Sequence, residues 1–329
     1  MRRGVYYMQT KKEALLAAYR GKPIDFIPNI QSCTNSVVFP GDRYFGPDKT
    51  GYDAWGVNWT QLGPDPGIDG SMVTPGTELF EYFDEWKEHV KFPDLEAMHA
   101  ADILRGMAAN WDRENNVTHV LVLSGGAFER MNQLVGMENA LCAFYEYPDE
   151  VKEFCDAFCE YRLKCIDLIH EVLHPDVIEM HDDWGTNTNM FFSPEIWREF
   201  IKPMEQKYID RIHSYGMIYN HHSCGYIMQI IPDLVEMGLD CINPLNVSND
   251  VALIKKNYGD KITLMGGVDN QKIDADGCPE EDIRKEARRV IDAYGKTGRY
   301  IANYIFGSRR SRDIFLDEVE KYGMEALIR

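Results

Sequence analysis

Two residues that could hold a metal ion stand close together in the stretch NHHSCG, residues 220–225, directly after an apolar run. If that run is a β-strand, His222 and Cys224 project from the same face, so an imidazole nitrogen and a thiolate can reach one ion. Zinc readily accepts this pair of ligands. The spacing alone leaves a second interpretation open, a buried cysteine beside a hydrogen-bonded histidine. His221 points to the opposite face, and we expect it to be structural.

Two further apolar runs also end in polar side chains. The stretch HDDWGTNTN carries His181, Asp182 and Asp183, and the stretch MGGVDNQ carries Asp269 and Asn270. Adjacent carboxylates are costly to bury unless a metal, a cation or hydrogen-bond donors compensate them. Two roles are therefore open for the paired aspartates: acids of a functional site, or caps that satisfy a helix or a loop.

These polar ends must be positioned by strands, and the chain contains a series of candidates. Most are continuous apolar runs, as expected of parallel strands covered on both faces, and segments of helical period separate them. This alternation favours a (β/α) barrel, with a doubly wound open sheet as the alternative. In a barrel, the active site is assembled at the carboxyl ends of the strands. The candidate strands are residues 26–30, 119–125, 177–183, 217–223, 241–246, 262–268 and 300–306.

Two of the intervening helices are well marked. One covers residues 147–173, where apolar residues recur with helical spacing, and we expect its cysteines to pack as small core residues. The other begins at Pro194, which opens its first turn, and Ser193 is placed to cap it. We expect this second helix to kink or stop at Pro203, because proline cannot donate a backbone hydrogen bond.

Residues 40–80 break this rhythm, because glycine, proline, aspartate and aromatic residues crowd together there. Loops of this length inside a compact domain are usually functional or disordered, and the aromatic content argues against disorder. We therefore expect a long ordered excursion or lid, without strands, that shapes one wall of a binding cleft.

The composition limits the partners. The 329 residues carry a formal net charge of -18 at pH 7 without a long basic cluster, which argues against nucleic acid and anionic membrane surfaces. No apolar run reaches the length of a signal-peptide core or of a membrane span, so we expect a cytoplasmic protein. The eight cysteines show no disulfide-scaffold spacing, and we expect reduced thiols.

Several motifs, taken in order, carry a resemblance to a known family. They are ALLAAYRGKPIDFIP, YDAWGVNW, HDDWGTNTNMFFSPEIWREFIKPMEQKYIDRIHSYG, HHSCGYIMQIIPDLVEMGLDCINPL and LMGGVDNQ. The chain resembles the uroporphyrinogen decarboxylase superfamily, and within it the zinc-dependent, corrinoid-linked methyltransferases. The resemblance implies an α/β fold, a distorted (β/α)8 TIM-type barrel formed by one domain over residues 1–329. It also implies that His222 and Cys224 hold zinc and that a partner protein carries a cobalamin-type corrinoid.

The sequence departs from the decarboxylase branch at two points. That branch places paired arginines just after the first strand, whereas no arginine lies between Arg20 and Arg43 here. Near the last strand, Phe306 stands where the decarboxylases have a histidine. Porphyrinogen decarboxylation is therefore disfavoured.

A third departure leaves the set of metal ligands incomplete. Family members that methylate coenzyme M supply a third ligand as a cysteine near the last strand, and this chain has no cysteine beyond Cys278. The candidates for the missing position are Asp183, Asp182 and His181, with Cys241 less favoured. One thiolate among harder nitrogen and oxygen ligands leaves zinc a stronger Lewis acid, which favours polarising an ether oxygen.

These observations lead us to expect a methyltransferase. It would move a methyl group from a methoxylated small molecule, an aromatic methyl ether, to the corrinoid protein. Asp182, Asp183 and His181 would complete the shell of the ion or orient the leaving oxygen. The residues expected to line the substrate pocket are Asn220, Asn303, Trp55, Trp59 and Trp184.

Two alternatives stay open. The methyl group could pass the other way, from the methylated corrinoid to a thiol or folate acceptor, although the absent late cysteine counts against a thiol. The chain could also be a non-catalytic zinc-binding or corrinoid-binding accessory protein. An open coordination position, which accepts exogenous ligands, distinguishes a catalytic metal site from a closed structural one.

Overall fold

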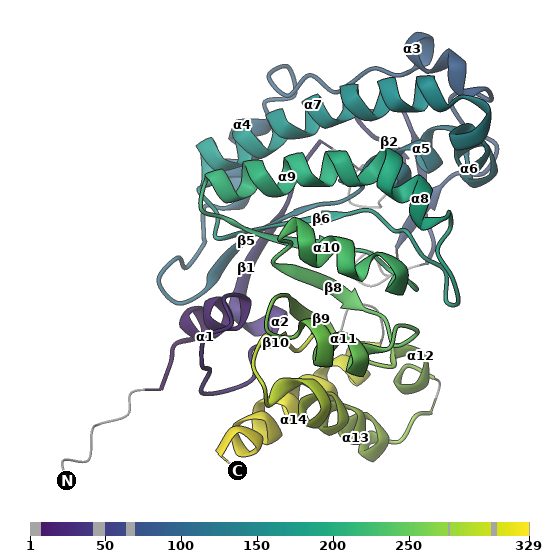
Figure 1. Ribbon diagram of the computed structural model, residues 1–329. Coiled ribbons are helices and arrows are strands. Elements are labelled where there is room, and N and C mark those ends of the chain that lie inside the picture. Colours follow the sequence, from purple (N-terminus) through teal and green to yellow (C-terminus); the bar gives the residue numbers. More distant parts are fainter. Residues whose placement is uncertain (1–7, 42–49, 64–69, 276, 304–307, 329) are drawn as a thin grey trace. The chain divides into compact units, whose positions relative to one another are not determined.

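The chain divides into two compact units (Figure 1). The computed structural model describes residues 8–41, 50–63, 70–275, 277–303 and 308–328. The stretch NHHSCG lies within the central unit. The central unit is formed by Ser36–Asn110 and His119–Leu239, and the flanking unit by Met1–Asn35, Trp111–Thr118 and Asp240–Arg329.

The sheet of the central unit is built from strands that neighbour one another in chain order. It contains the greater part of β1 (Thr34–Val38) and β5 (Val117–Val122), together with β6 (Val177–His181) and β7 (Ile218–His222). β5, β6 and β7 pair in parallel. Almost all their residues are buried, as expected of parallel strands that are covered on both faces.

The register between β6 and β7 brings their polar ends together. Glu179 lies opposite Asn220, and His181 lies opposite His222. Because alternate residues of a strand share a face, these four side chains belong to the same face of the sheet. The loops that follow the two strands therefore start side by side.

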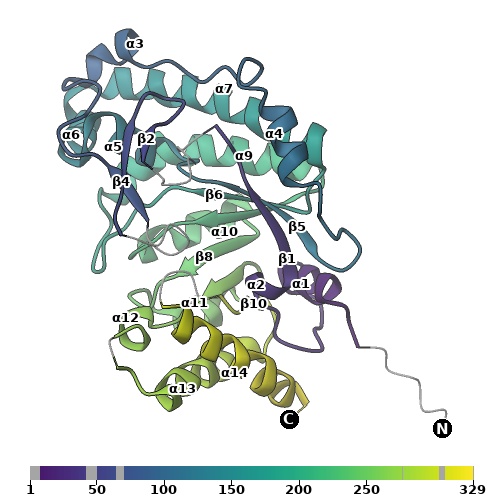
Figure 2. The ribbon, with the colours of Figure 1, turned by 180° about the vertical axis from the view of Figure 1, so that it is seen from behind.

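Long helices pack against this sheet. α7 (Pro148–Leu173) confirms the predicted helix, and it runs beside α9 (Lys202–Ser214), which also contacts β7 (Figures 1 and 2). The buried side chains of α7 include Cys155, Cys159 and Cys165, as expected. The shorter helices of the unit are η1 (Phe83–Glu85), α3 (Trp86–His89), α4 (Ala100–Met107), α5 (Ala127–Val135), α6 (Met137–Glu146), α8 (Pro194–Ile196), η2 (Trp197–Ile201), η3 (Met228–Ile230) and α10 (Ile231–Met237).

The second predicted helix starts as expected and continues through Pro203. Ser193 Oγ accepts a hydrogen bond from Ile196 N at 3.3 Å, and Pro194 opens α8. The chain then makes a π-helical turn over Trp197–Ile201 and runs on as α9. Pro203 lies in the first turn of α9, where a missing backbone donor is tolerated.

The excursion at residues 40–80 contains strands, so the prediction of none was wrong. β2 (Gly51–Tyr52), β3 (Asn58–Gln61) and β4 (Ser71–Val73) form a small antiparallel sheet. Asp53 Oδ1 accepts hydrogen bonds from the backbone N–H groups of Trp55 and Val57, both at 2.9 Å. This side chain closes the turn between β2 and β3. Residues 42–49 and 64–69 lie outside the described part, and the role of the excursion as a cleft wall stays a prediction.

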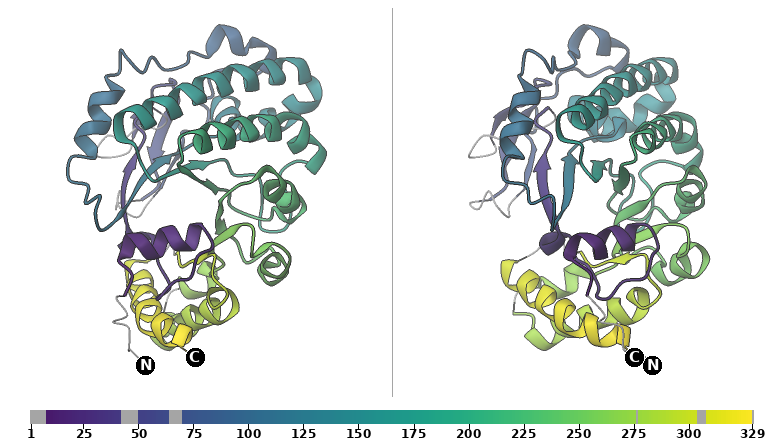
Figure 3. Two further views of the ribbon diagram at one scale, coloured as in Figure 1. Left: turned by 60° about the vertical axis from the view of Figure 1, so that its left-hand side comes forward. Right: turned by 90° about the vertical axis from the view of Figure 1, so that its left-hand side faces the viewer.

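The flanking unit repeats the pattern of parallel strands and helices. β8 (Cys241–Leu245) pairs with β9 (Thr263–Gly266), and β9 pairs with β10 (Tyr300–Ile301). In Figure 3, the two helices near the C-terminal end of the chain, α13 and α14, pack side by side. The helices of this unit are α1 (Lys11–Tyr19), α2 (Ile30–Cys33), α11 (Val251–Tyr258), α12 (Asn270–Ile273), α13 (Glu280–Val290), η4 (Ile291–Gly295) and α14 (Arg309–Ile328).

The predicted first strand, residues 26–30, was wrong. Asn29 makes only an isolated bridge with Ala302, and its side chain caps α2 by accepting a hydrogen bond from Ser32 N at 2.8 Å. The cap starts a short helix, so the strand is displaced to β1. At the other end of the chain, β10 confirms the start of the predicted strand at 300–306, while Phe306 lies outside the described residues.

The order of the parallel strands confirms the predicted fold class, a distorted (β/α)8 TIM-type barrel. Within each unit the parallel strands neighbour one another in the order in which they occur along the chain. A doubly wound sheet would reverse that order at a switch point. The extent of a single domain over residues 1–329 stays a prediction. Among the described residues, no helix is both long enough and apolar enough to cross a membrane.

Candidate metal centre

The predicted ligands meet at the end of β7. His222 is the last residue of this strand, Cys224 follows in the loop, and the His222 Nε2 and Cys224 Sγ atoms lie 3.4 Å apart. Asp183 comes from the loop after β6, and its Oδ1 lies 3.7 Å from His222 Nε2. All three donor atoms lie within 4.8 Å of one another. The structure therefore brings the two predicted ligands together with one candidate for the third.

Close contacts between the two loops hold this arrangement. Asp183 Oδ1 accepts a hydrogen bond from Cys224 N at 2.7 Å. Gly225 has a φ of +83°, and a Cβ atom at this position would lie 2.1 Å from Gly185 O. Any other residue after the cysteine would strain the backbone and push the loops apart. The glycine thus keeps Cys224 against Asp183.

The separations of the donors fit a zinc ion. Zinc binds histidine nitrogen at about 2.0–2.1 Å and thiolate sulfur at about 2.3 Å in a tetrahedron, which places the two ligand atoms about 3.6 Å apart. The observed 3.4 Å between Nε2 and Sγ is close to that value, and the Asp183 oxygen lies 3.7 Å from Nε2, against about 3.4 Å for a nitrogen and an oxygen ligand. Three protein ligands are typical of catalytic zinc sites, which keep one position for water or substrate.

Burial sets the protonation of the donors in the metal-free protein. It lowers the pKa of His222 to about 3, with the neighbouring His181 adding to the effect. The imidazole is therefore neutral at pH 7 and has a lone pair to donate. Burial, together with the Asp183 carboxylate, raises the pKa of the Cys224 thiol. The thiol accordingly keeps its proton until a cation displaces it.

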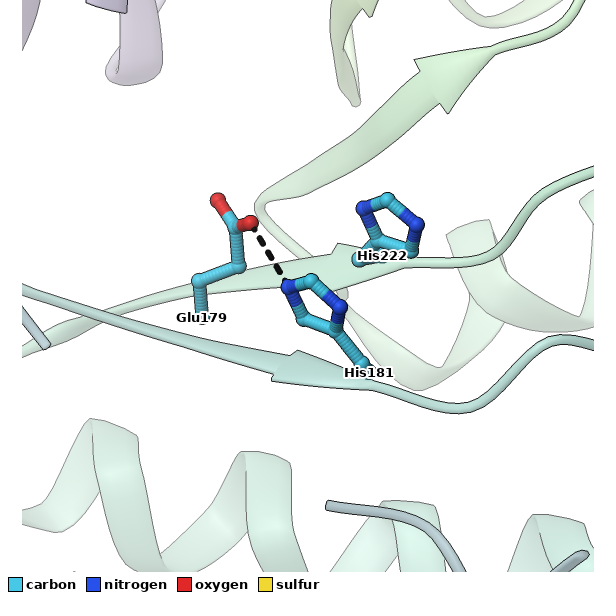
Figure 4. A group of neighbouring side chains, drawn as sticks. All are labelled: Glu179, His181 and His222. Carbon is cyan, nitrogen blue, oxygen red and sulfur yellow. Dashed lines mark hydrogen bonds and ion pairs between the residues drawn. The ribbon is translucent and has the colours of Figure 1, made fainter. Parts of the chain in front are cut away.

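His181 lies beside this centre but is oriented differently. Its ring stacks on that of His222, with centroids 3.9 Å apart and planes at 5°. The lone pairs of an imidazole lie in the ring plane, so two parallel rings cannot direct them to one ion without rotating. Figure 4 shows that His181 instead points to Glu179, whose Oε1 lies 3.1 Å from Nε2. Asp183 is therefore the better candidate for the third ligand.

Asp182 faces away from the three donors. Its carboxylate accepts a hydrogen bond from Glu129 N at 2.7 Å, in the first turn of α5, and one from Trp184 Nε1 at 2.8 Å. Burial raises the pKa of this side chain. Gly126 is needed here, because a Cβ atom would lie 2.1 Å from the Asp182 carboxylate carbon. This placement favours the capping role that the sequence left open.

The tryptophans predicted to line the pocket are buried in packing roles. Trp55 and Trp59 are each 3% exposed, and Trp59 Nε1 donates to Asp53 Oδ2 at 2.9 Å. The guanidinium carbon of Arg130 lies 4.4 Å from the centre of the Trp55 ring. Trp184 is fully buried. Their contact with substrate stays a prediction.

The two predicted asparagines lie in different units. Asn220, in the central unit, shares a face with His222, and its Nδ2 donates to Glu179 Oε2. Asn303, in the flanking unit, donates to Asn243 Oδ1 at 2.9 Å. Cys241 is also in the flanking unit, buried on β8, and it belongs to neither group of potential metal ligands found among the described residues.

Sequence reasoning missed two residues near the centre, Glu179 and His119. Glu179 forms a second group of potential ligands with His181 and His222, and His119 Nε2 lies 3.3 Å from its Oε2. The available signal was a glutamate inside the apolar run VIEMH, two positions before His181 and thus on the same face.

Comparison with known proteins supports the resemblance seen in the sequence. A family model for uroporphyrinogen decarboxylase (URO-D) matches residues 81–308. A curated relative, the methylcobamide:CoM methyltransferase MtaA of Methanosarcina barkeri, is 21% identical over 86% of this chain and 89% of its own length. A solved methyltransferase structure from Methanosarcina mazei is similar over 95% of this chain and 99% of that one, with a TM-score of 0.64 and 17% identity. This last match supports the fold.

Proposed function

Because this chain belongs to the uroporphyrinogen decarboxylase family, we propose that it is a zinc-dependent methyltransferase that moves a methyl group from a methoxylated small molecule to a corrinoid protein. We take the methyl donor to be an aromatic methyl ether. The observation that carries the proposal is the convergence of His222 Nε2, Cys224 Sγ and Asp183 Oδ1 at neighbouring strand ends. The name of the curated relative supports methyl transfer and a corrinoid partner.

The donor set favours an oxygen substrate over a thiol. Zinc held by one imidazole, one thiolate and one carboxylate would act as a Lewis acid toward a substrate oxygen. Only one cysteine, Cys224, occurs in the ligand groups found among the described residues. A set richer in thiolates would donate more charge and suit a bound thiolate better.

The exposure of the side chains around the centre supports the proposal of an ether substrate. The Asp183 side chain is 42% exposed and the His181 side chain 15% exposed, so both border solvent while His222 is buried. His181 is placed to hydrogen-bond to the departing oxygen. In the proposed reaction the bond between methyl and oxygen breaks, the methyl group passes to the reduced corrinoid, and the oxygen gains a proton to give a hydroxyl product.

A turnover assay tests this proposal. The protein is incubated with a reduced corrinoid protein and a panel of methoxylated aromatics, and the methylated corrinoid and the hydroxyl product are measured. We expect turnover to be lost in Cys224→Ala and Asp183→Ala and kept in Cys142→Ala, a control at an exposed cysteine on α6. Turnover at the full rate by metal-free protein would contradict the proposal.

A second candidate function reverses the direction of transfer. The relative from Methanosarcina barkeri is named for a methylcobamide and CoM, which favours a methylated corrinoid as donor. Loss of the methyl group from a methylated corrinoid protein only when a thiol is added would support this candidate. Metal binding without turnover in either direction would support the non-catalytic accessory protein.

A further inference from the structure

Glu179 is a buried carboxylate with nitrogen atoms on several sides. It lies in the middle of β6 and is 4% exposed. His181 Nε2 lies 3.1 Å from its Oε1, and His119 Nε2 lies 3.3 Å from its Oε2. Asn220 Nδ2 donates to Oε2 as well. None of these contacts is to His222, Cys224 or Asp183, the three converging donors.

The carboxylate stays charged in spite of its burial. Burial alone would raise the pKa of Glu179, but the contacts with His119 and His181 outweigh it and hold the pKa below its ordinary value. An uncompensated buried carboxylate would be strongly destabilising, so the two imidazoles are held close to it. Glu179 therefore restrains the ring of His181 by a charge-assisted contact.

His181 contacts the candidate metal centre by stacking its ring on the ring of His222. His181 and His222 are almost parallel, at 5°, with centroids 3.9 Å apart. His222 Nδ1 is buried and has no hydrogen-bond partner among the described residues, so no such bond fixes that ring. The plane of His222 is instead set by packing, and His181 supplies one of its faces (Figure 4).

We propose that Glu179 is a positioning residue of the metal centre. It fixes the ring of His181, and that ring in turn fixes the plane in which His222 Nε2 faces Cys224 and Asp183. A ligating histidine usually donates its other ring N–H directly to a carboxylate, a backbone carbonyl or water. Here the carboxylate acts one ring further away. The inference rests on the proposed function in one respect, that the centre binds a metal.

The protein contains a matched control for this carboxylate. Glu205 is 2% exposed, and its Oε2 accepts a hydrogen bond from Tyr219 OH at 2.7 Å. It also lies 3.5 Å from Nδ1 of His221, on the opposite face of β7. Glu205→Gln therefore replaces a buried carboxyl group beside a histidine of β7 without touching the stacked pair His181 and His222.

The experiment compares Glu179→Gln with Glu205→Gln in the full chain. Zinc affinity is measured by competition with a chromophoric chelator, and the ligand field is read from the visible absorption spectrum of the Co²⁺-loaded protein. We expect Glu179→Gln to weaken zinc binding by about 10- to 100-fold and to shift the Co²⁺ bands. Glu205→Gln should leave both unchanged while lowering the unfolding midpoint of the metal-free protein.

A double variant tests the route of the effect. Because Glu179 acts through His181, the variant with both Glu179→Gln and His181→Asn should bind zinc no more weakly than His181→Asn alone. If Glu179→Gln does not fold, His181→Asn alone should still show the weakened affinity and shifted spectrum. Additive losses in the double variant would overturn the proposal.

Two further outcomes separate the failure of this proposal from failure of the function. Wild-type affinity and an unshifted spectrum in Glu179→Gln, with zinc bound normally by the parent protein, would overturn the positioning role alone. A parent protein that binds neither zinc nor Co²⁺ would overturn the metal-dependent function and the positioning role together.

Discussion

The two faces of strand β7 carry similar residue types in different settings. On one face, His222 meets Cys224 and lies near a carboxylate. On the other, the His221 ring stacks on Trp184 with centroids 4.2 Å apart, and its Nδ1 lies 3.0 Å from Tyr219 OH. Both histidines are almost fully buried, at 3% and 1% exposure. The two adjacent histidines in the stretch NHHSCG therefore have different neighbours.

The difference lies in what converges on each ring. His222 Nε2 faces a thiol and a carboxylate whose side chains reach the surface, so a cation can enter and displace the thiol proton. His221 is enclosed by buried side chains and belongs to no group of potential metal ligands among the described residues. A histidine and a carboxylate in contact therefore do not mark a site. The candidate centre differs in having three donors that converge at an accessible edge.

The largest expected effect comes from removing the Cys224 thiol, on the face of β7 that carries His222. Cys224→Ala should lower zinc affinity by more than the roughly 10- to 100-fold that is typical of outer residues, because a direct ligand is lost. Chelator competition measures the change, with Cys142→Ala as the control. Equal zinc affinity in the two variants would contradict the assignment of Cys224 as a zinc ligand.

The next effect is on stability and concerns His221, on the opposite face of β7. His221→Gln should lower the free energy of unfolding by about 1–3 kcal/mol, because buried Glu205 and Tyr219 lose a polar neighbour and Trp184 loses its stacked ring. Urea unfolding of the metal-free protein measures this loss. An unchanged free energy of unfolding would show that the contacts of His221 with Glu205 and Trp184 do not stabilise the fold.

The pH dependence of stability should differ between the parent protein and His222→Gln. The folded pKa of His222 is lowered to about 3 from an ordinary 6.5, so between these values the unfolded chain binds a proton that the folded protein does not. Acidification from pH 6.5 toward 3 therefore favours unfolding. In the variant the slope of unfolding free energy against pH should be smaller, by up to about 1.4 kcal/mol per pH unit. Urea titrations with a chelator at several pH values check this; equal slopes would contradict it.

The smallest effect separates the two adjacent aspartates. Asp182→Asn leaves one acceptor oxygen for the N–H groups of Glu129 and Trp184, so the free energy of unfolding should fall by about 1–2 kcal/mol. Zinc affinity should not change, whereas Asp183→Asn should reduce it. Zinc binding that is weakened equally by both substitutions would place Asp182 among the ligands.

The alternation of side chains along a strand was enough to find part of the centre. It predicted that His222 and Cys224 share a face and that His221 does not. The acidic residues at the end of the preceding strand were also recognised, but choosing Asp183 over Asp182 needed the loop geometry. Glu179 lies two positions before His181 on the same face, but its contacts with His119 and Asn220 depend on the registers of β6 against β5 and β7, which no local pattern encodes.

Other sequence predictions were wrong or incomplete where a capping side chain decided the local structure. Asn29 caps α2, which displaces the first predicted strand. Asp269, at a strand end that looked equally polar, accepts a hydrogen bond from Lys272 N at 3.2 Å and caps α12. Asp53 organises the turn that allows strands inside the excursion. Capping carboxylates and amides resemble functional ones in composition, and only their partners distinguish them.

The most direct test of the metal centre is elemental analysis of the purified parent protein beside His222→Ala and His221→Ala, prepared without added metal. We predict about one zinc ion per chain in the parent protein and in His221→Ala, and none in His222→Ala. Equal metal content in all three proteins, or no metal in the parent protein, would contradict the assignment of the centre to His222, Cys224 and Asp183.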